Sequence, residues 1–228
     1  RDLGNLVVVI GYSRRSSASL PYYGGLNGDL DKTVEFIALN KPDYVIFDEL
    51  RKPRDFQLIR SLRASGINVV AFLSSRELKL ALENALEKIP LPQIPHVIQK
   101  IIEVKCGQPI QVYRVSQSIR APMGLTTVFP GLVVYIFRGE EPVLELYSMN
   151  GQIVIRDLSK VFEDLRSIER SVKKVLRSIR KTDPGVFAEK VALDKVVFRV
   201  ARSKLKRLEK LLPKLEERLG VTVELAPR

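Results

Sequence analysis

The N-terminal part of the chain alternates short apolar runs with helix-forming stretches, and this alternation limits its possible folds more than any other feature. The apolar runs contain no charged residue, which is typical of strands buried on both faces of a sheet. Strands that alternate with helices favour a mostly parallel sheet, so we predict an α/β fold. The runs lie at residues 6–10, 44–47 and 67–73, and the helical patterns at residues 33–39, 56–64 and 77–88.

The patterning changes after the third helical stretch. Residues 89–95 (IPLPQIP) contain three prolines and predict a linker. Short alternating runs continue to Ile155, with a turn signal at Asn150-Gly151, and they predict an antiparallel β appendage. We therefore assign residues 1–157 to one region, an α/β core with this appendage.

The last third of the chain begins with its clearest helix. In residues 159–181, apolar residues recur at intervals of three and four and leave a charged opposite face. Residues 182–185 (TDPG) break the chain, and a compact β-α-α-β pattern then occupies residues 196–225. We predict that residues 158–228 form a second region, made of this helix and the β-α-α-β unit.

The positive charge is concentrated in the same last third. The chain has 38 Lys and Arg against 26 Asp and Glu, a net charge of +12. Residues 151–228 hold 20 of these cations and 11 of the anions, a net +9, which leaves +3 for the first 150 residues. Such asymmetry favours DNA or RNA as a partner first and an anionic membrane surface second. The alternative is a well-solvated, lysine-rich surface without a partner.

The candidate nucleic-acid contacts are basic side chains on two expected helices. No acidic residue interrupts the cations in the C-terminal half of the long helix, although part of this bias complements the helix dipole. More cations crowd the first helix of the β-α-α-β pattern. The candidates are Lys173, Lys174, Arg177, Arg180, Lys181, Arg202, Lys204, Lys206, Arg207 and Lys210.

Several classes of chemistry lack the residues they need. Cys106 is the only cysteine, so an intramolecular disulfide is excluded and we expect a reducing, cytoplasmic setting. His96 is the only histidine, and we interpret it as a linker residue; this inventory excludes the usual zinc sites. The pairs Ser16-Ser17 and Ser74-Ser75 have no histidine at the spacing of a nucleophile and its base, so acyl transfer is unsupported. No apolar run approaches about 18 residues, and we predict no membrane span.

The sharpest local signal is KPDYVIFDELRKPRDF at residues 41–56. Its apolar strand delivers Asp48 and Glu49 to the strand's C-terminal end. In P-loop enzymes an aspartate at this position helps to hold the nucleotide-bound Mg²⁺, and a following glutamate can polarise the attacking water. The alternative is a pair of solvated or helix-capping carboxylates.

Residues 29–156 resemble the Walker B region and the adjoining downstream segment of archaeal ATPases that join a PIN domain, a PilT-type P-loop domain and a KH domain. The likeness runs from DLDKTVEFIALNKPDYVIFDELRKPRDF through PQIPHVIQKIIEVKCGQPIQVYRV to ELYSMNGQIVI, and residues 1–3 (RDL) look like a family tripeptide. The resemblance implies a RecA-like core, a hexameric ring and ATP-driven work on DNA junctions. It also implies catalytic roles for Asp48, Glu49 and Arg51, with Mg²⁺ held at Asp48.

The sequence departs from this family's pattern in ways that concern catalysis. No G-x-x-x-x-G-K-[ST] occurs, so the loop and lysine that hold the β- and γ-phosphates are missing from this sequence. Where the family has a histidine, an Asp-Ala and a Gln-Arg, this chain has Ser74, Leu80-Ala81 and Glu83-Asn84. We expect no cofactor for this chain alone, and ATP with Mg²⁺ only if a P-loop lies upstream. Whether the protein is an enzyme stays open.

The C-terminal β-α-α-β pattern resembles a minimal KH motif. A KH domain binds the nucleotide backbone with a G-x-x-G loop between its two helices. Here that joint is Leu211-Leu212-Pro213, without glycine. The resemblance therefore implies a degenerate KH-like unit, in which electrostatic binding survives better than sequence recognition.

Three functions remain open. The first is a non-catalytic or weakly catalytic relative of the PilT-type ATPases that binds nucleic acid through its basic tail. The second is the C-terminal portion of an active hexameric ATPase that acts on DNA junctions. The third is a structural module that docks on a larger assembly.

Overall fold

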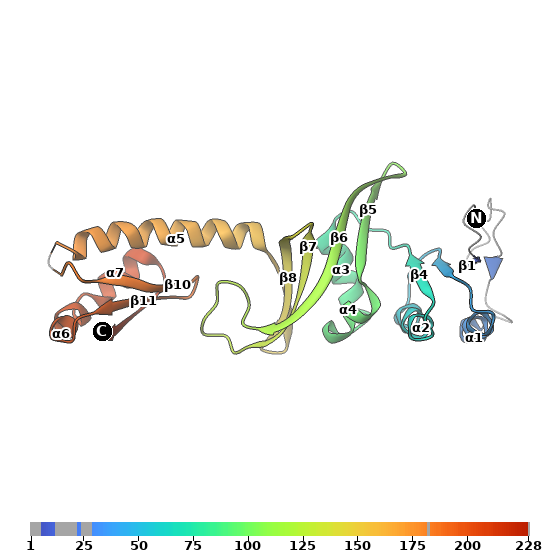
Figure 1. Cartoon of the computed structure of the whole chain (residues 1–228), viewed down its shortest axis with the longest axis horizontal. Coiled ribbons are helices and arrows are strands. Elements are labelled where there is room, and N and C mark those ends of the chain that lie inside the picture. The colour runs from blue at the N-terminus through green and yellow to red at the C-terminus, as the bar shows by residue number, and fades with distance from the viewer. Residues whose placement is uncertain (1–5, 12–21, 24–28, 182, 228) are drawn as a thin grey trace. The chain divides into compact units, whose positions relative to one another are not determined.

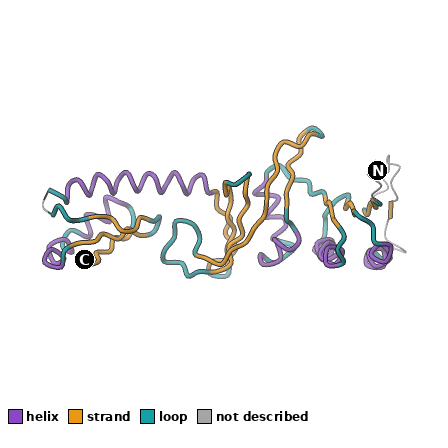
Figure 2. Tube along the Cα trace, in the orientation of Figure 1, coloured by secondary structure: helices purple, strands orange, loops and turns teal. Residues whose placement is uncertain are grey.

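The computed structural model shows a mixed α/β protein, as the sequence predicts (Figure 1). It describes residues 6–11, 22–23, 29–181 and 183–227. The chain divides into two compact units, residues 1–110 and 111–228. Figure 2 shows helices and strands interspersed along the whole described chain.

The first unit contains a four-stranded sheet with the order β2-β1-β3-β4, and all of its strand pairs are parallel. Val45 and Phe47 of β3 are buried on one face of the sheet, together with Ile10 of β1, whereas Ile46 on the other face is half-buried and its neighbour Val70 is 46% exposed. The expectation that these strands are buried on both faces is therefore wrong. The elements are β1 (Val7–Ile10), β2 (Tyr22–Tyr23), α1 (Leu30–Asn40), β3 (Tyr44–Phe47), α2 (Pro53–Ala64), β4 (Asn68–Ala71) and α3 (Leu78–Leu86). The three predicted strands and three predicted helices are therefore present.

The predicted linker at residues 89–95 is folded. Leu91–Gln93 form a 3-10 turn (η1), and Ile94–Val97 form the short helix α4. Leu91 and Ile94 are buried, so these apolar side chains add to a core instead of spacing two regions. Arg63 of α2 donates hydrogen bonds to the carbonyls of His96 and Val97, which satisfies the end of α4. His96 is thus an exposed residue of a short helix, which corrects the linker interpretation.

A five-stranded sheet with the order β5-β6-β7-β8-β9 comes next in the chain. The pairings from β6 to β9 are antiparallel, as predicted for the appendage. Tight turns at Cys106-Gly107 and Asn150-Gly151 have positive φ at both residues, the geometry that two-residue hairpins favour. The strands are β5 (Lys100–Lys105), β6 (Gln108–Arg120), β7 (Gly131–Arg138), β8 (Glu141–Met149) and β9 (Gln152–Asp157).

Helix α5 (Leu158–Ile179) belongs to two cores of the second unit. The carboxylate of Asp157 begins the helix by accepting hydrogen bonds from the amide and hydroxyl of Ser159, and the hydroxyl bond chiefly lowers the pKa of Asp157. Leu158 and Val161 then pack against β7 and β8, whereas Val172 and later apolar residues pack in the C-terminal core. The predicted boundary at residue 157 consequently falls inside one compact unit, because a single helix joins both of its cores.

The C-terminal core lies between helices and a third sheet, which has three strands in the order β10-β11-β12. Strand β11 pairs antiparallel with β10 and parallel with β12. The alternating residues Val196, Phe198 and Val200 of β11 are fully buried. The elements are β10 (Phe187–Val191), β11 (Lys195–Val200), the 3-10 turn η2 (Arg202–Lys204), α6 (Leu205–Glu209), α7 (Leu212–Leu219) and β12 (Thr222–Pro227). The order β11-α6-α7-β12 matches the predicted β-α-α-β pattern, whereas strand β10 was not predicted.

Candidate functional site

The carboxylates predicted from the first unit lie at the C-terminal edge of its parallel sheet. The amide of Asp48 donates to the carbonyl of Ile10 at 2.9 Å, and the amide of Leu50 donates to the carbonyl of Phe72 at 2.9 Å. These two bonds hold the segment after β3 between the ends of β1 and β4. Open α/β sheets bind ligands at this edge. Asp48 and Glu49 are both half-buried there.

Two of the three predicted catalytic residues pair with each other. The guanidinium of Arg51 donates two hydrogen bonds to Oε2 of Glu49, the one from Nε at 2.7 Å. The side chains remain 53% and 39% exposed, so solvent screens the pair and its contribution to stability is small. The sequence places Arg51 near the carboxylates but gives no sign that it neutralises one of them.

Asp55 fixes the backbone of this edge. It is fully buried, and its Oδ2 accepts hydrogen bonds from the amides of Arg51 at 2.7 Å and Lys52 at 2.8 Å. A carboxylate in the first turn of α2 satisfies amides that the helix itself leaves unpaired. Arg54 of the same helix donates to Asp31 of α1 at 2.8 Å. The helix-capping role that was the alternative for Asp48 and Glu49 therefore belongs to Asp55.

Metal binding at Asp48 stays a prediction. Across the described ranges there is no group of three or more His, Cys, Asp or Glu side chains that could hold a metal ion. The tripeptide at residues 1–3 and the pair Ser16-Ser17 lie outside the described residues.

The basic residues of α5 form an exposed surface in the second unit. Lys173, Lys174, Arg177, Arg180 and Lys181 are all exposed at or just beyond the C-terminal half of the helix. The Nε of Arg180 donates to the carbonyl of Val186 at 2.9 Å, which fixes its guanidinium where the chain turns toward β10. Within the described part of the chain, none of these five cations has a carboxylate within 4.0 Å.

The second group of candidate cations lies on and around α6. Arg202, Lys206, Arg207 and Lys210 are exposed, and Lys204 is half-buried. Helix α6 packs on β12, whereas α5 packs on β10 and α7, so the two groups occupy different helices of the same unit. The sequence predicts both helices and their charges, but not the elements on which each helix packs.

The joint between α6 and α7 has no glycine. Leu211 precedes α7, and Pro213 lies in its first turn, where the missing amide costs no helical hydrogen bond. A glycine-rich clamp brings phosphates close to main-chain amides. The phosphate contacts available near this joint are therefore the side chains of Lys210 and its basic neighbours.

Asp194 is a structural site that the sequence analysis missed. Its carboxylate accepts four hydrogen bonds, from the amides and hydroxyls of Thr126 and Thr127, at 2.7 to 3.2 Å. Burial raises the pKa of Asp194, but these bonds outweigh burial and lower the pKa to about 2. The partners are 67 and 68 residues away in the sequence, so no local pattern signals the contact.

A buried ion pair holds the N-terminal part of the loop at residues 121–127, the loop whose other end carries Thr126 and Thr127. Glu145 of β8 is fully buried, lies 3.1 Å from Nη1 of Arg156, and accepts a hydrogen bond from the amide of Met123. Burial raises the pKa of Glu145, and the Met123 bond and the charge of Arg156 oppose this rise. In the same sheet, Tyr135 accepts a hydrogen bond from Arg120 at 2.8 Å. Residues 121–127 are thus held at both ends by carboxylates.

Comparison with known proteins finds two archaeal relatives, one of which is named for KH and PIN domains. No protein-family model matches it. It is 26% identical over 221 residues to a Methanocaldococcus jannaschii protein named as an uncharacterized KH and PIN-domain containing protein. It is also 26% identical over 91 residues to a Sulfolobus acidocaldarius Holliday junction branch migration ATPase.

Both matches cover only part of the relative's length. The first match covers 91% of this chain but 34% of the relative, and the second covers 40% of this chain and 18% of the relative. The chain therefore spans about a third of the first relative. In the described residues, no helix is both long and apolar enough to cross a bilayer.

Proposed function

We propose that this chain is a non-catalytic or weakly catalytic relative of PilT-type P-loop ATPases that binds nucleic acid through the basic surface of its second unit. The observation that carries the proposal is the concentration of exposed cations on α5 and around α6. Cationic side chains on rigid helices attract the phosphate backbone, and counterions are released when they neutralise its phosphates. The name of the M. jannaschii relative, which includes a KH domain, supports the same proposal.

The order of β11, α6, α7 and β12 supports a degenerate KH-like unit as the scaffold of this surface. Without glycines between α6 and α7, lysine and arginine side chains hold the phosphates in place of main-chain amides. Phosphate contacts position a protein on nucleic acid and carry little sequence information. Binding should therefore depend steeply on salt and only weakly on sequence.

A salt titration of oligonucleotide binding tests the proposal. We expect Gln substitutions at Lys173, Lys174, Arg177, Lys206 and Arg207 to weaken binding to unrelated sequences alike. The slope of log K against log salt should fall by roughly one unit for each phosphate that the variant no longer neutralises. Fluorescence anisotropy with single- and double-stranded DNA and RNA between about 50 and 200 mM salt measures this slope.

A matched variant controls for net charge. Gln substitutions at Lys32, Arg60, Arg76, Lys79 and Lys100 remove the same number of exposed cations from the first unit. This variant should bind as the parent chain does. An equal loss in both variants, or no binding at about 50 mM salt, contradicts the proposal and favours a structural module that docks on a larger assembly.

The second candidate function is the C-terminal portion of a hexameric ATPase that works on DNA junctions. The position of Asp48 and Glu49 at the C-terminal edge of a parallel sheet favours it, as does the name of the S. acidocaldarius relative. In such an enzyme Asp48 would help to hold Mg²⁺ and Glu49 would orient the attacking water. ATP and Mg²⁺ are then the cofactors, and a P-loop must come from outside this sequence. Joining the chain to the relative's upstream region and measuring ATP hydrolysis would test this candidate.

A further inference from the structure

A straight stripe of cations runs along the exposed side of α5. Its members recur at intervals of four, three and four residues. With about 100° of rotation per residue, they therefore fall within roughly 60° of one another around the helix. At about 1.5 Å of rise per residue, the stripe is roughly 16 Å long. All of its side chains are exposed, and together they are called the α5 stripe: Arg166, Arg170, Lys173 and Arg177.

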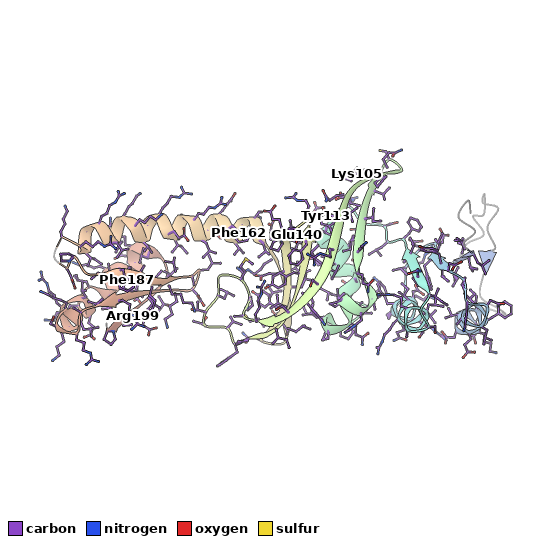
Figure 3. The ribbon with its side chains drawn as sticks, in the orientation of Figure 1. Lys105, Tyr113, Glu140, Phe162, Phe187 and Arg199 are labelled. Carbon is purple, nitrogen blue, oxygen red and sulfur yellow. The ribbon has the colours of Figure 1, made fainter. Side chains whose placement is uncertain are left out.

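The α5 stripe lies opposite the buried side of the helix. Arg177 is roughly 140° from Val172 and roughly 160° from Val175 around the helix, and both valines are buried in the C-terminal core. Figure 3 shows side chains that project from α5 away from the three-stranded sheet. Because α5 packs in two cores, the backbone under the stripe is held along its length. A rigid helix keeps the charges in line, so binding costs little ordering of the chain.

The charges of the α5 stripe are not compensated by neighbouring carboxylates. In the described ranges, none of its four cations has a carboxylate within 4.0 Å. The Nε of Arg170 donates to the carbonyl of Arg166 at 3.3 Å, which keeps this guanidinium on the stripe. The exposed acids Glu163 and Glu169 lie before the stripe and beside it. The stripe therefore presents an uninterrupted row of positive charge to a polyanion.

No aromatic ring lies on the α5 stripe. Phe162 is the one aromatic residue of α5, a helix that the structure describes throughout, and it packs against the core next to β7 and β8 (Figure 3). Proteins that hold single strands combine a basic track with aromatic side chains on which bases stack. A row of cations without rings can hold phosphates but offers nothing to unpaired bases. This favours a duplex, whose backbone carries about one charge per 1.7 Å.

The cations around α6 cannot form such a row. Helix α6 has only five residues, and the exposed Glu209 lies among its cations. Lys206 and Lys210 share one side at a spacing of four residues, whereas Arg207 is about 100° away from Lys206 around the helix. Lys204 is half-buried. Fewer of these cations can therefore reach one phosphate backbone at the same time.

We propose that the α5 stripe is the principal phosphate-binding site of the second unit and lies along the backbone of double-stranded nucleic acid. This inference rests on the proposed nucleic-acid function and assigns it a site and a substrate class. One strand of a duplex has a phosphate about every 3.4 Å along the axis, so the stripe spans about five phosphates. Each cation of the stripe then has a phosphate to neutralise. Such contacts carry no sequence information, so duplexes of unrelated sequence should bind alike.

Exchanging neighbouring residues of α5 moves the charges without changing the composition or the net charge. Ser167 and Ser178 are exposed, so an arginine placed at either position stays outside the cores. Each exchange moves a cation by about 100° around the helix and off the stripe. The exchange variant combines Arg166→Ser, Ser167→Arg, Arg177→Ser and Ser178→Arg.

We expect the exchange variant to bind a blunt duplex more weakly than the parent chain does. Two phosphates lose their cations, so the slope of log K against log salt should fall by about two units. An effect of net charge alone predicts no change. Fluorescence anisotropy between about 50 and 200 mM salt measures the slope, and circular dichroism melts check that the variant is folded.

A second pair of variants compares α5 with α6 by removing four cations from each. Gln at all four positions of the α5 stripe should lower the duplex slope by about four units, and the matched α6 variant should lower it by less than half as much. The parent chain should bind a duplex more tightly than a single strand of the same length, with a slope of about −0.9 against −0.7 per contact. The matched variant has Gln at Arg202, Lys206, Arg207 and Lys210.

The outcomes separate this inference from the function on which it rests. The α5 stripe is overturned as the principal site if the exchange variant binds as the parent does, or if the α6 variant loses as much binding as the α5 variant. Single-strand binding as tight as duplex binding overturns the substrate class. In each of these cases the nucleic-acid function stands if the five-cation variant still loses binding. No binding of any oligonucleotide by the parent chain at about 50 mM salt overturns both.

Discussion

The sheet edge of the first unit and helix α5 of the second unit differ in how their charges are compensated. At the sheet edge of the first unit, charged side chains neutralise one another locally: Arg51 pairs with Glu49, and Arg54 pairs with Asp31. On α5 of the second unit, the cationic side chains are exposed, and in the described residues none has a carboxylate within 4.0 Å. Compensated charges fix a local backbone, whereas uncompensated charges create a field that reaches a partner. This difference in charge is the reason that we assign binding to the second unit.

The largest expected effect comes from breaking each unit's core in turn. Phe47 and Phe198 are 2% and 0% exposed and occupy β3 and β11, one in each unit. Replacing either with alanine should destabilise its own unit by about 3 to 5 kcal/mol. We expect Phe198→Ala to abolish oligonucleotide binding and Phe47→Ala to leave it within about twofold. Hydrogen exchange of the β3 and β11 amides, together with binding assays, measures both effects.

One pattern of binding and hydrogen exchange would contradict this comparison. If Phe47→Ala lowers binding as much as Phe198→Ala does, while β11 amides keep their protection, the first unit also contacts nucleic acid. The assignment of binding to the second unit alone would then be wrong.

Periodicity predicts the elements of both units because it reports local burial. The strand predicted at residues 44–47 has the same bounds in the structure, and the long helix predicted at 159–181 is observed at Leu158–Ile179. The five apolar residues of α5 that are buried recur at helical spacing, so the sequence alone shows which face packs.

Sequence patterns fail where contacts are long-range. Three prolines at residues 89–95 predict a linker, but Arg63, more than thirty positions away, completes a short helix there. The boundary predicted at residue 157 misses that α5 packs in two cores. These features depend on which surfaces meet, which periodicity does not encode.

An intermediate effect should come from Asp194, the one strongly shifted carboxylate that joins two parts of the second unit in the described residues. Its pKa of about 2 in the folded chain lies below the ordinary value of 3.8, so its contribution to stability is complete above about pH 4. That contribution is lost as the pH falls from about 4 to 2. Because the group is partly exposed, we expect Asp194→Asn to cost only about 1 kcal/mol at pH 7.

Urea denaturation of the parent chain and Asp194→Asn at several pH values tests this sign. The difference between the two should be constant between pH 7 and 5 and should shrink below pH 4. Glu217→Gln removes the same charge from an exposed position of α7 and is the matched control, with an expected change within about 0.5 kcal/mol. A difference that grows as the pH falls would contradict the role of the ionised carboxylate.

The smallest expected effects belong to the sheet edge of the first unit. An exposed ion pair contributes about 0.2 to 1 kcal/mol, so Arg51→Met should barely change the free energy of unfolding.

For hydrolysis, Asp48 and Glu49 can hold a metal ion and a water, but this sequence has no loop that grips the triphosphate. We therefore expect no appreciable ATP hydrolysis by the chain and no change in Asp48→Asn or Glu49→Gln, measured as phosphate release at saturating Mg²⁺. Arg51→Met sharpens this test, because it removes the cation bound to Glu49 and leaves the glutamate available to a water. If hydrolysis is detected and disappears in Glu49→Gln, the edge is a working active site, and charge compensation does not distinguish the two units.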